Sequence, residues 1–211
     1  DIDCEGGEET ARFAGAGAIF VETDVTVPEQ VQAALDSTVE SFGGLDILYN
    51  NAGGSTTVDG PVTEVPLDEF WRAIGLDLFG TFLVCKYGIP KLVAGGGGVV
   101  INTGSIVAMR GLPGRDSYTA AKGAVVALTR AIAAQYGRDG VRANVLAPGV
   151  VMTERVRKMF ESDGDLQAAQ ERQFLGLSEP EHIAAAAAYL ASDDAAMMTG
   201  QILPVDGGFT V

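Results

Sequence analysis

Short runs of apolar and β-branched residues alternate along the chain with longer stretches whose apolar residues recur every three or four positions. Runs of the first kind predict strands, and they occupy residues 17–25, 45–54 (a strand followed by a turn), 98–105, 141–149 and 201–208. Stretches of the second kind predict helices, at about residues 26–44, 67–93, 117–136 and 181–192. The alternation has no internal repeat and no linker. It therefore predicts one α/β domain over residues 1–211, a doubly wound parallel sheet between two helical layers.

Two of the helix starts carry a recognisable pair of residues. Thr26 and Glu29 have the spacing of a capping box, in which each side chain accepts from the other residue's backbone N–H. Ser178 and Glu181 repeat that spacing before the last helix, where His182 is interpreted as a helix-start residue.

The composition is that of a folded protein, with 47% hydrophobic and 20% charged residues. The net charge of −14 offers no basic patch for phosphates, which argues against nucleic acid and anionic membranes as partners. No uninterrupted apolar stretch reaches the ~18 residues of a membrane-spanning helix. Cys4 and Cys85 stand in unrelated contexts, so free thiols in the cytoplasm are expected.

Small polar residues and glycines gather where the expected strands end. The carboxyl ends of parallel strands meet at one edge of a sheet, where such residues let a flat ligand approach the backbone closely. The positions concerned are Asp24, Asn50, Asn51, Ala52, Gly53, Thr103, Gly104, Ser105, Pro148 and Gly149. Each of them alone is as well explained by a plain turn, but four such groups at one edge predict a binding site.

Tyr118 and Lys122 lie four residues apart in the helix expected over 117–136, so they share a helix face. A close ammonium favours the phenolate, which makes Tyr118 a usable acid or base. Ser105 ends the preceding strand, and its hydroxyl could orient a substrate oxygen. The spacing Tyr-x-x-x-Lys is common, and by itself it is better explained by an ordinary helix surface.

Taken together, the motifs resemble the short-chain dehydrogenase/reductase family over the whole of residues 1–211. They are the strand-end Ser105, Tyr118 with Lys122, Asn50-Asn51-Ala52-Gly53, Pro148-Gly149, Asp24-Val25, Asn144 and the ending Gly200–Gly208. The resemblance implies a Rossmann-like fold, NAD or NADP as cofactor and no metal. The substrate it implies is a small alcohol or ketone.

The resemblance also carries roles for individual residues. Tyr118 becomes the catalytic acid or base, Ser105 positions the substrate oxygen, and Lys122 binds the nicotinamide ribose and lowers the pKa of Tyr118. The remaining cofactor contacts that it implies are Asp24 and Val25 at adenine, Asn50, Ala52 and Gly53 along the sheet edge, Pro148 and Gly149 in the turn, and Val151 and Thr153 at the carboxamide.

Two features depart from the family pattern. The family motif Asn-Leu-x-Gly reads Asp77-Leu78-Phe79-Gly80 here, and helical spacing turns Asp77 inward. A buried carboxylate needs a counter-charge. We expect Lys122 to supply it through a water molecule, with Asp77 in the family's proton relay.

The second departure is a missing motif. The glycine-rich turn that cradles a pyrophosphate precedes Asp1 in the family pattern, together with the first β-α-β portion. We therefore expect the chain to be an incomplete record of a longer protein. Asp1 would then end the second family strand and favour NAD over NADP by repelling a 2′-phosphate, with Asp3 as the alternative for that position.

Substrate specificity is expected from the loop after Ser105, the loop after Gly53 and residues 154–177, interpreted as a mobile helical lid. Arg110, Arg155 and Arg157 could meet a substrate carboxylate, although solvated surface roles explain them better. The resemblance also implies a homo-oligomer, a tetramer or a dimer, that associates through the helices at 67–93 and 117–136.

Three functions are compatible with these features. The first is an oxidoreductase that moves a hydride between nicotinamide and a secondary alcohol or ketone. An alternative within that class is an NADPH-dependent reductase of the 3-oxoacyl-carrier-protein type. The third is a binding or scaffold protein without turnover, which the missing glycine-rich turn favours and the Ser105, Tyr118 and Lys122 set opposes.

Overall fold

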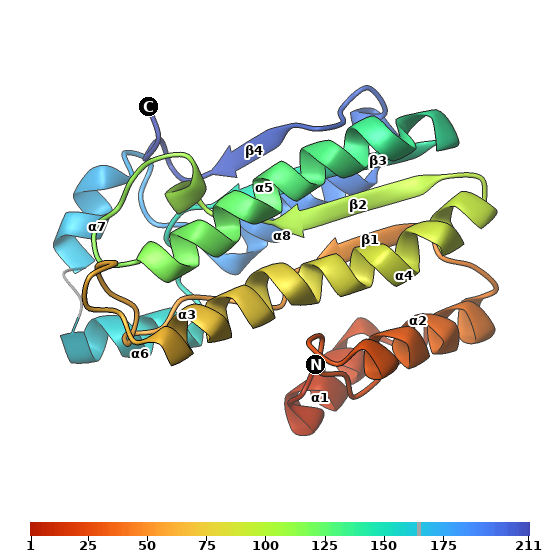
Figure 1. Ribbon diagram of the computed structural model, residues 1–211, viewed down its shortest axis with the longest axis horizontal. Coiled ribbons are helices and arrows are strands. Elements are labelled where there is room, and N and C mark those ends of the chain that lie inside the picture. The colour runs from red at the N-terminus through yellow and green to blue at the C-terminus, as the bar shows by residue number, and fades with distance from the viewer. Residues whose placement is uncertain (164–165) are drawn as a thin grey trace.

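The computed structural model describes residues 1–163 and 166–211, and within them a parallel sheet forms the centre of the fold (Figure 1). Its strands follow one another in the order β1-β2-β3-β4. They are β1 (Ile47–Asn50), β2 (Gly98–Thr103), β3 (Val141–Pro148) and β4 (Ile202–Val205). Because every pair is parallel, all the carboxyl ends lie at the same edge of the sheet.

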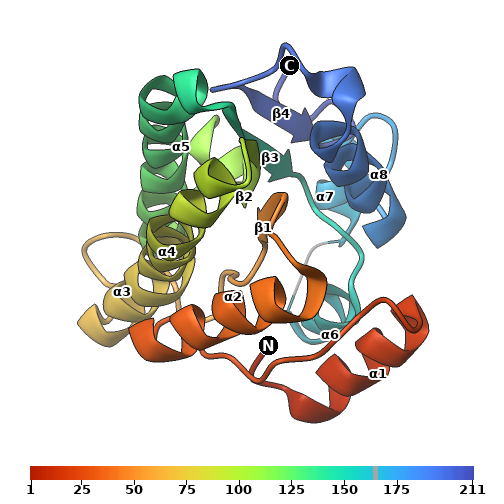
Figure 2. The ribbon, with the colours of Figure 1, turned by 90° about the vertical axis from the view of Figure 1, so that its right-hand side faces the viewer.

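Helices cover both faces of this sheet (Figure 2). On one face, α4 (Thr81–Ala94) and α5 (Asp116–Tyr136) pack against the sheet, with α2 (Pro28–Phe42) beyond α4. Val100 of β2 belongs to that core, whereas its neighbours Val99 and Ile101 face α8 (Pro180–Ala191) on the other side. Successive strand residues thus serve opposite faces, as the period of two requires. The predicted three-layer α/β arrangement is confirmed.

One continuous helical run crosses the molecule from Leu67 to Ala94. It consists of α3 (Leu67–Ala73), the π-helical turns of Ile74–Gly80, and α4. Pro90 lies inside α4 and does not end it. By length and composition alone this run could span a membrane. In the fold it is a core helix, since Leu83, Ile89 and Leu92 are buried against the sheet and α2.

The N-terminal part differs from the sequence-based expectation. After α1 (Cys4–Ala14), residues 17–25 form no strand in the described chain. A strand needs a ladder of backbone hydrogen bonds. This segment makes one such bond across to another segment, from the N–H of Thr23 to the carbonyl oxygen of Asp1 at 3.0 Å. The predicted strand at 17–25 is therefore wrong for the described residues.

Both predicted capping boxes are also wrong. The residue that caps α2 is Val27 and not Thr26. The Oγ1 of Thr26 donates to Asp24 Oδ1 at 2.7 Å. The cap of α8 is Glu179, whose N–H donates to Nδ1 of His182 at 3.0 Å. His182 does stand in the first turn, as predicted, because its ring nitrogen can accept a backbone N–H that the helix leaves unpaired.

Residues 154–177, expected as a lid, contain α6 (Glu154–Asp163) and α7 (Leu166–Arg172). Residues 164–165 of that segment lie outside the described residues. Shorter helical turns at Ile106–Ala108, Gly137–Asp139 and Asp193–Ala195 complete the secondary structure of the described chain. The predicted helical character of residues 154–177 is confirmed for the described residues, and the mobility of this segment stays a prediction.

Candidate active site

A cavity of about 800 Å³ opens beside the carboxyl ends of β1, β2 and β3. The turns that follow these strands, the start of α5 and the segment after β3 all contribute to its wall. Among the predicted site residues, the wall contains Gly53, Ser105, Tyr118, Lys122, Pro148, Gly149, Val151 and Thr153. The fold therefore brings together residues that are up to 100 positions apart, from Gly53 to Thr153.

Lys122 and Asp77 form a buried ion pair behind this wall. The Nζ of Lys122 lies 3.0 Å from Oδ1 of Asp77, and the side chains are 2% and 0% exposed. Lys122 also donates to the carbonyl oxygen of Thr103 at 2.8 Å, and Asp77 Oδ1 accepts from the N–H of Gly54 at 2.9 Å. The inward orientation of Asp77 is confirmed. The expected water between the two side chains is wrong, because their contact is direct.

The second oxygen of Asp77 has no partner. Oδ2 is buried and makes no hydrogen bond within the described chain. An ionised carboxylate without full hydrogen bonding is costly to bury, so the ammonium of Lys122 is what makes its burial tolerable. The pair consequently ties the middle of the helical run at residues 74–80 to the face of α5 that carries Tyr118 and Lys122.

Tyr118 is half-buried, and its ring centre lies 5.6 Å from Lys122 Nζ. Burial raises the pKa of Tyr118 from 10.0 to about 12, and the negative charge of Asp77 adds to the increase. The Ser105 hydroxyl and the positive charges of Arg155 and Arg115 act in the opposite direction and lower this pKa. The pKa of Tyr118 is therefore raised overall, and the lowering effect expected of Lys122 stays a prediction. The charge of Lys122 is offset by Asp77 at 3.0 Å.

Ser105 takes its position from the end of β2. It caps the short helical turn Ile106–Ala108, and its Oγ accepts from the N–H of Val107 at 3.3 Å. The residue is buried, and its hydroxyl acts on the Tyr118 phenol, whose pKa it lowers. The two hydroxyl groups that the sequence placed 13 residues apart thus meet in the same cavity wall.

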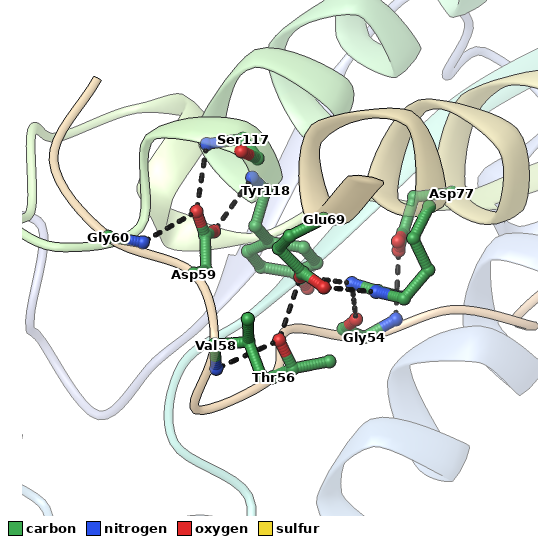
Figure 3. Close-up of polar contacts among 10 residues, drawn as sticks. Gly54, Thr56, Val58, Asp59, Gly60, Glu69, Asp77, Ser117 and Tyr118 are labelled. Atoms are coloured by element: carbon green, nitrogen blue, oxygen red, sulfur yellow. Dashed lines mark hydrogen bonds and ion pairs between the residues drawn. The ribbon is translucent and has the colours of Figure 1, made fainter. Parts of the chain in front are cut away.

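Asp59 holds the start of the helix that carries Tyr118 (Figure 3). Its Oδ1 accepts from the N–H of Ser117 at 3.1 Å and from that of Gly60 at 2.9 Å, and its Oδ2 accepts from the N–H of Tyr118 at 3.0 Å. The first N–H groups of a helix lack partners within the helix, so a carboxylate there satisfies them and is favoured by the helix dipole. Sequence reasoning missed Asp59, because the contact joins a loop to a helix 58 positions later.

Glu69 and Arg72, both in α3, fix the same loop, and Figure 3 shows Glu69 beside Thr56 of that loop. Arg72 donates to both oxygens of Glu69 at 2.9 Å and to the carbonyl oxygen of Gly54 at 3.1 Å. Thr56 donates to Glu69 at 2.7 Å. The neighbouring guanidinium lowers the pKa of Glu69, which is 6% exposed. This pair could not be singled out from the sequence, since an acid and a base at i and i+3 on a helix are common on solvated surfaces.

The other predicted cofactor residues do not line this cavity. Asn50 donates from Nδ2 to Asn102 Oδ1 at 2.7 Å, inside the fold. Asp24 accepts from Thr26, which lowers the pKa of the Asp24 carboxyl. Ala52 and Asp1 are exposed, and Val25 packs against Gly80 of the helical run.

The cavity suits the nicotinamide end of a dinucleotide. Gly53 lines the cavity with a φ of +148°, and a Cβ there would lie 2.2 Å from Asp77 Oδ1, so glycine lets this turn pass close to the buried ion pair. Lys122 has three N–H groups, and the hydrogen bond to Thr103 and the ion pair with Asp77 use two of them. The third remains available for a ribose hydroxyl at the cavity wall.

Comparison with known proteins agrees with this geometry. Residues 1–210 match the family model described as enoyl-(acyl carrier protein) reductase. The chain is 38% identical over 213 residues to 2,5-dichloro-2,5-cyclohexadiene-1,4-diol dehydrogenase of Sphingobium indicum (strain DSM 16412 / CCM 7286 / MTCC 6364 / B90A). The alignment covers 100% of this chain and 85% of that protein. It is 39% identical over 211 residues to cis-4-hydroxycyclohexanecarboxylate dehydrogenase of Sinomonas cyclohexanicum, covering 98% of this chain and 83% of that protein.

Among solved structures, the fold is similar to 7α-hydroxysteroid dehydrogenase complexed with NADH and 7-oxoglycochenodeoxycholic acid. The TM-score is 0.91 with 29% sequence identity, over 99% of this chain and 82% of that one. Fold, site and relatives define a nicotinamide-dependent oxidoreductase that acts on CH–OH or C=O groups. The chain belongs to the short-chain dehydrogenase/reductase family.

Proposed function

We propose that this cavity is the active site and that Tyr118, Ser105 and Lys122 carry the reaction. The observation behind the proposal is that all three line one cavity, with Lys122 fixed between Asp77 and Thr103. In ketone reduction, Tyr118 donates its phenolic proton to the substrate oxygen while Ser105 hydrogen-bonds that oxygen. In alcohol oxidation, the Tyr118 phenolate takes the hydroxyl proton. Bound nicotinamide supplies or accepts the hydride.

Asp77 is the fourth member of the proposed set. It acts through Lys122, whose ammonium it holds at 3.0 Å and whose charge it offsets. Because the pKa of Tyr118 is raised to about 12, the phenol is protonated at neutral pH and ready to act as an acid. We therefore infer that reduction is favoured near neutrality, and that oxidation strengthens as the pH rises toward the pKa of Tyr118.

The proposed substrate is a secondary alcohol or ketone of moderate size. Val107, Leu112, Met159 and Phe160 give the cavity an apolar wall. The relatives named above act on a cyclic diol and on a cyclic hydroxy acid, which supports a ring carrying a secondary hydroxyl. The family description in terms of acyl carrier protein keeps an NADPH-dependent 3-oxoacyl-type reductase as the second candidate.

NAD is the proposed cofactor, with NADP as the alternative. The preference rests on a carboxylate at the adenosine end, from Asp1 or Asp3. Both residues are exposed, and Asp1 Oδ1 accepts from the N–H of Asp3 at 3.0 Å. Asp24 and Val25 with adenine, Asn50, Ala52 and Gly53 along the strand end, and Val151 and Thr153 with the carboxamide remain the proposed contacts.

A direct test is a titration of the full chain with NADH and NADPH, followed by cofactor fluorescence, and then a screen of cyclic alcohols and ketones with the cofactor that binds. Binding of NADH with turnover of cyclic substrates supports the proposal. Binding of NADPH with turnover of 3-oxoacyl thioesters alone supports the second candidate. If cofactor binds and no substrate is turned over at any pH, the proposed catalytic roles are wrong.

A single domain, a homo-oligomer and a cytoplasmic location complete the proposal. The helical run that the family uses for association carries exposed Trp71, Phe79 and Phe82, whose burial against a second copy would be favourable. The segment 154–177 is proposed to move as a lid on substrate binding.

A further inference from the structure

Two guanidinium groups stand at one loop of the cavity. Arg115, which directly precedes α5, donates from Nη1 to Ser55 Oγ at 2.8 Å. Arg155 reaches the neighbouring Gly54 from α6, where a Cβ on that glycine would lie 2.4 Å and 2.7 Å from its two Nη atoms. Both arginines line the cavity together with Tyr118. Their positive charges also act on the phenol and lower its pKa.

Neither guanidinium has an acidic partner in the described part of the chain. The ion pairs found there use other cations, including Lys122 with Asp77 and Arg157 with Glu179. Among the described residues that line the cavity, only Asp59 carries a carboxylate, and three backbone N–H groups already occupy it. The cavity is therefore locally cationic within a chain of net charge −14.

We propose that Arg115 and Arg155 bind a carboxylate on the substrate, so that the enzyme prefers hydroxy acids and keto acids over neutral alcohols and ketones. The inference rests on the proposed function. Guanidinium groups match carboxylates through paired, charge-assisted hydrogen bonds, which are stronger in a partly desolvated cavity. The apolar wall of Leu112, Met159 and Phe160 would receive the carbon skeleton between that carboxylate and the carbon that reacts.

An anion could also come from the cofactor, whose diphosphate carries the same kind of oxygen. The substrate is the better assignment because both arginines share a cavity with the phenol and the apolar wall. The experiment separates the two sources by measuring KM for the cofactor and for the substrate in every variant.

The test compares 3-hydroxycyclohexanecarboxylate and 3-hydroxybutanoate with their methyl esters, which carry the same hydroxyl without the charge. Arg115→Gln and Arg155→Gln are measured beside Arg157→Gln, a matched control from α6 whose guanidinium pairs with Glu179 at 2.7 Å outside the cavity wall. We expect the wild type to prefer the acids. In each cavity variant the ratio of kcat/KM for the acids to kcat/KM for the esters should fall about tenfold or more, as the loss of a charged hydrogen bond predicts, whereas the effect on the phenol is common to both substrates. The control should leave this ratio unchanged.

Three results would overturn the inference. Equal or better turnover of the esters by the wild type would remove the carboxylate preference while leaving the oxidoreductase intact. A higher KM for the cofactor in the variants, with an unchanged acid-to-ester ratio, would assign the arginines to the cofactor phosphates. Absence of turnover with acids, esters and the wider alcohol panel alike would refute the proposed function itself.

Discussion

Replacing Asp77 with Asn tests how the buried pair sets the reactivity of Tyr118. The change removes one negative charge and keeps the shape of the side chain, and its amide oxygen can still accept from the N–H of Gly54. Lys122 retains its bond to the carbonyl oxygen of Thr103. The ammonium is then no longer offset, so the phenolate is favoured and the pKa of Tyr118 falls.

The size of that fall follows from two distances. Asp77 Oδ1 lies 3.0 Å from Lys122 Nζ, which lies 5.6 Å from the centre of the Tyr118 ring. Together they place the carboxylate no more than about 8.6 Å from the ring centre, where a unit charge at an effective dielectric of about 20 is worth about 2 kcal/mol, or about 1.4 pH units. Solvent screening at the half-buried phenol reduces the expected shift to about 1 pH unit.

The assay is the pH dependence of kcat/KM for alcohol oxidation. Oxidation needs the phenolate, so the rate rises as the pH approaches the pKa of Tyr118. In Asp77→Asn this rise should move to lower pH by about 1 unit. Asp68→Asn is the matched control, because it removes an exposed carboxylate from the same helical run. A profile that stays in place, or moves to higher pH, in a folded Asp77→Asn variant would show that Asp77 does not hold the pKa of Tyr118 high.

The remaining predictions concern the contacts that hold the site. Lys122→Met leaves Asp77 buried without its counter-charge and should lower the free energy of unfolding by about 3 to 5 kcal/mol in urea titrations, part of which the double variant with Asp77→Asn should restore. Asp59→Ala should lower stability by about 1 kcal/mol and reduce kcat more than it raises KM, because the start of the Tyr118 helix loses its cap. Glu69→Gln should flatten the loss of stability below pH 4.5. In the wild type the pKa of the Glu69 carboxyl is lowered in the folded state. The ionised carboxyl therefore stabilises the fold above the ordinary pKa of 4.5, and this stabilisation is lost as the pH falls through the lowered pKa.

Each of these predictions has a contradicting result. A Lys122→Met variant as stable as the wild type would show that the ion pair does not stabilise the fold. Equal effects of Asp59→Ala on kcat and KM, without rescue by Asp59→Asn, would reduce that residue to a general structural role. Identical acid unfolding curves for the wild type and Glu69→Gln would mean that the pair with Arg72 does not contribute to stability in solution.

The sequence was sufficient for the parts of the site that follow from local periodicity. Tyr118 and Lys122 share a helix face because they are four residues apart, and Ser105 lies beside them because it ends a neighbouring parallel strand. The inward turn of Asp77 also followed from spacing along one helix. These inferences needed the period of an element and the common edge of a parallel sheet, both of which a sequence displays.

Long-range contacts were beyond such reasoning. The distance between Lys122 and Asp77 depends on how closely α5 packs on the π-helical turns at Ile74–Gly80, and neither feature is visible in a residue pattern. Asp59 looked like a loop residue, although it caps a helix from a distant segment. Residues 17–25 failed as a strand because a ladder needs a neighbour, which composition does not reveal.

The most direct test of the catalytic assignment is NADH formation, measured by absorbance with secondary alcohols as substrates, for the wild type and Tyr118→Phe side by side. The phenylalanine keeps the ring and removes the only group proposed to transfer the proton. Tyr118→Phe should bind NADH as the wild type does and lose at least about 100-fold in kcat, the usual contribution of a general acid or base. Full activity in Tyr118→Phe would contradict the catalytic assignment.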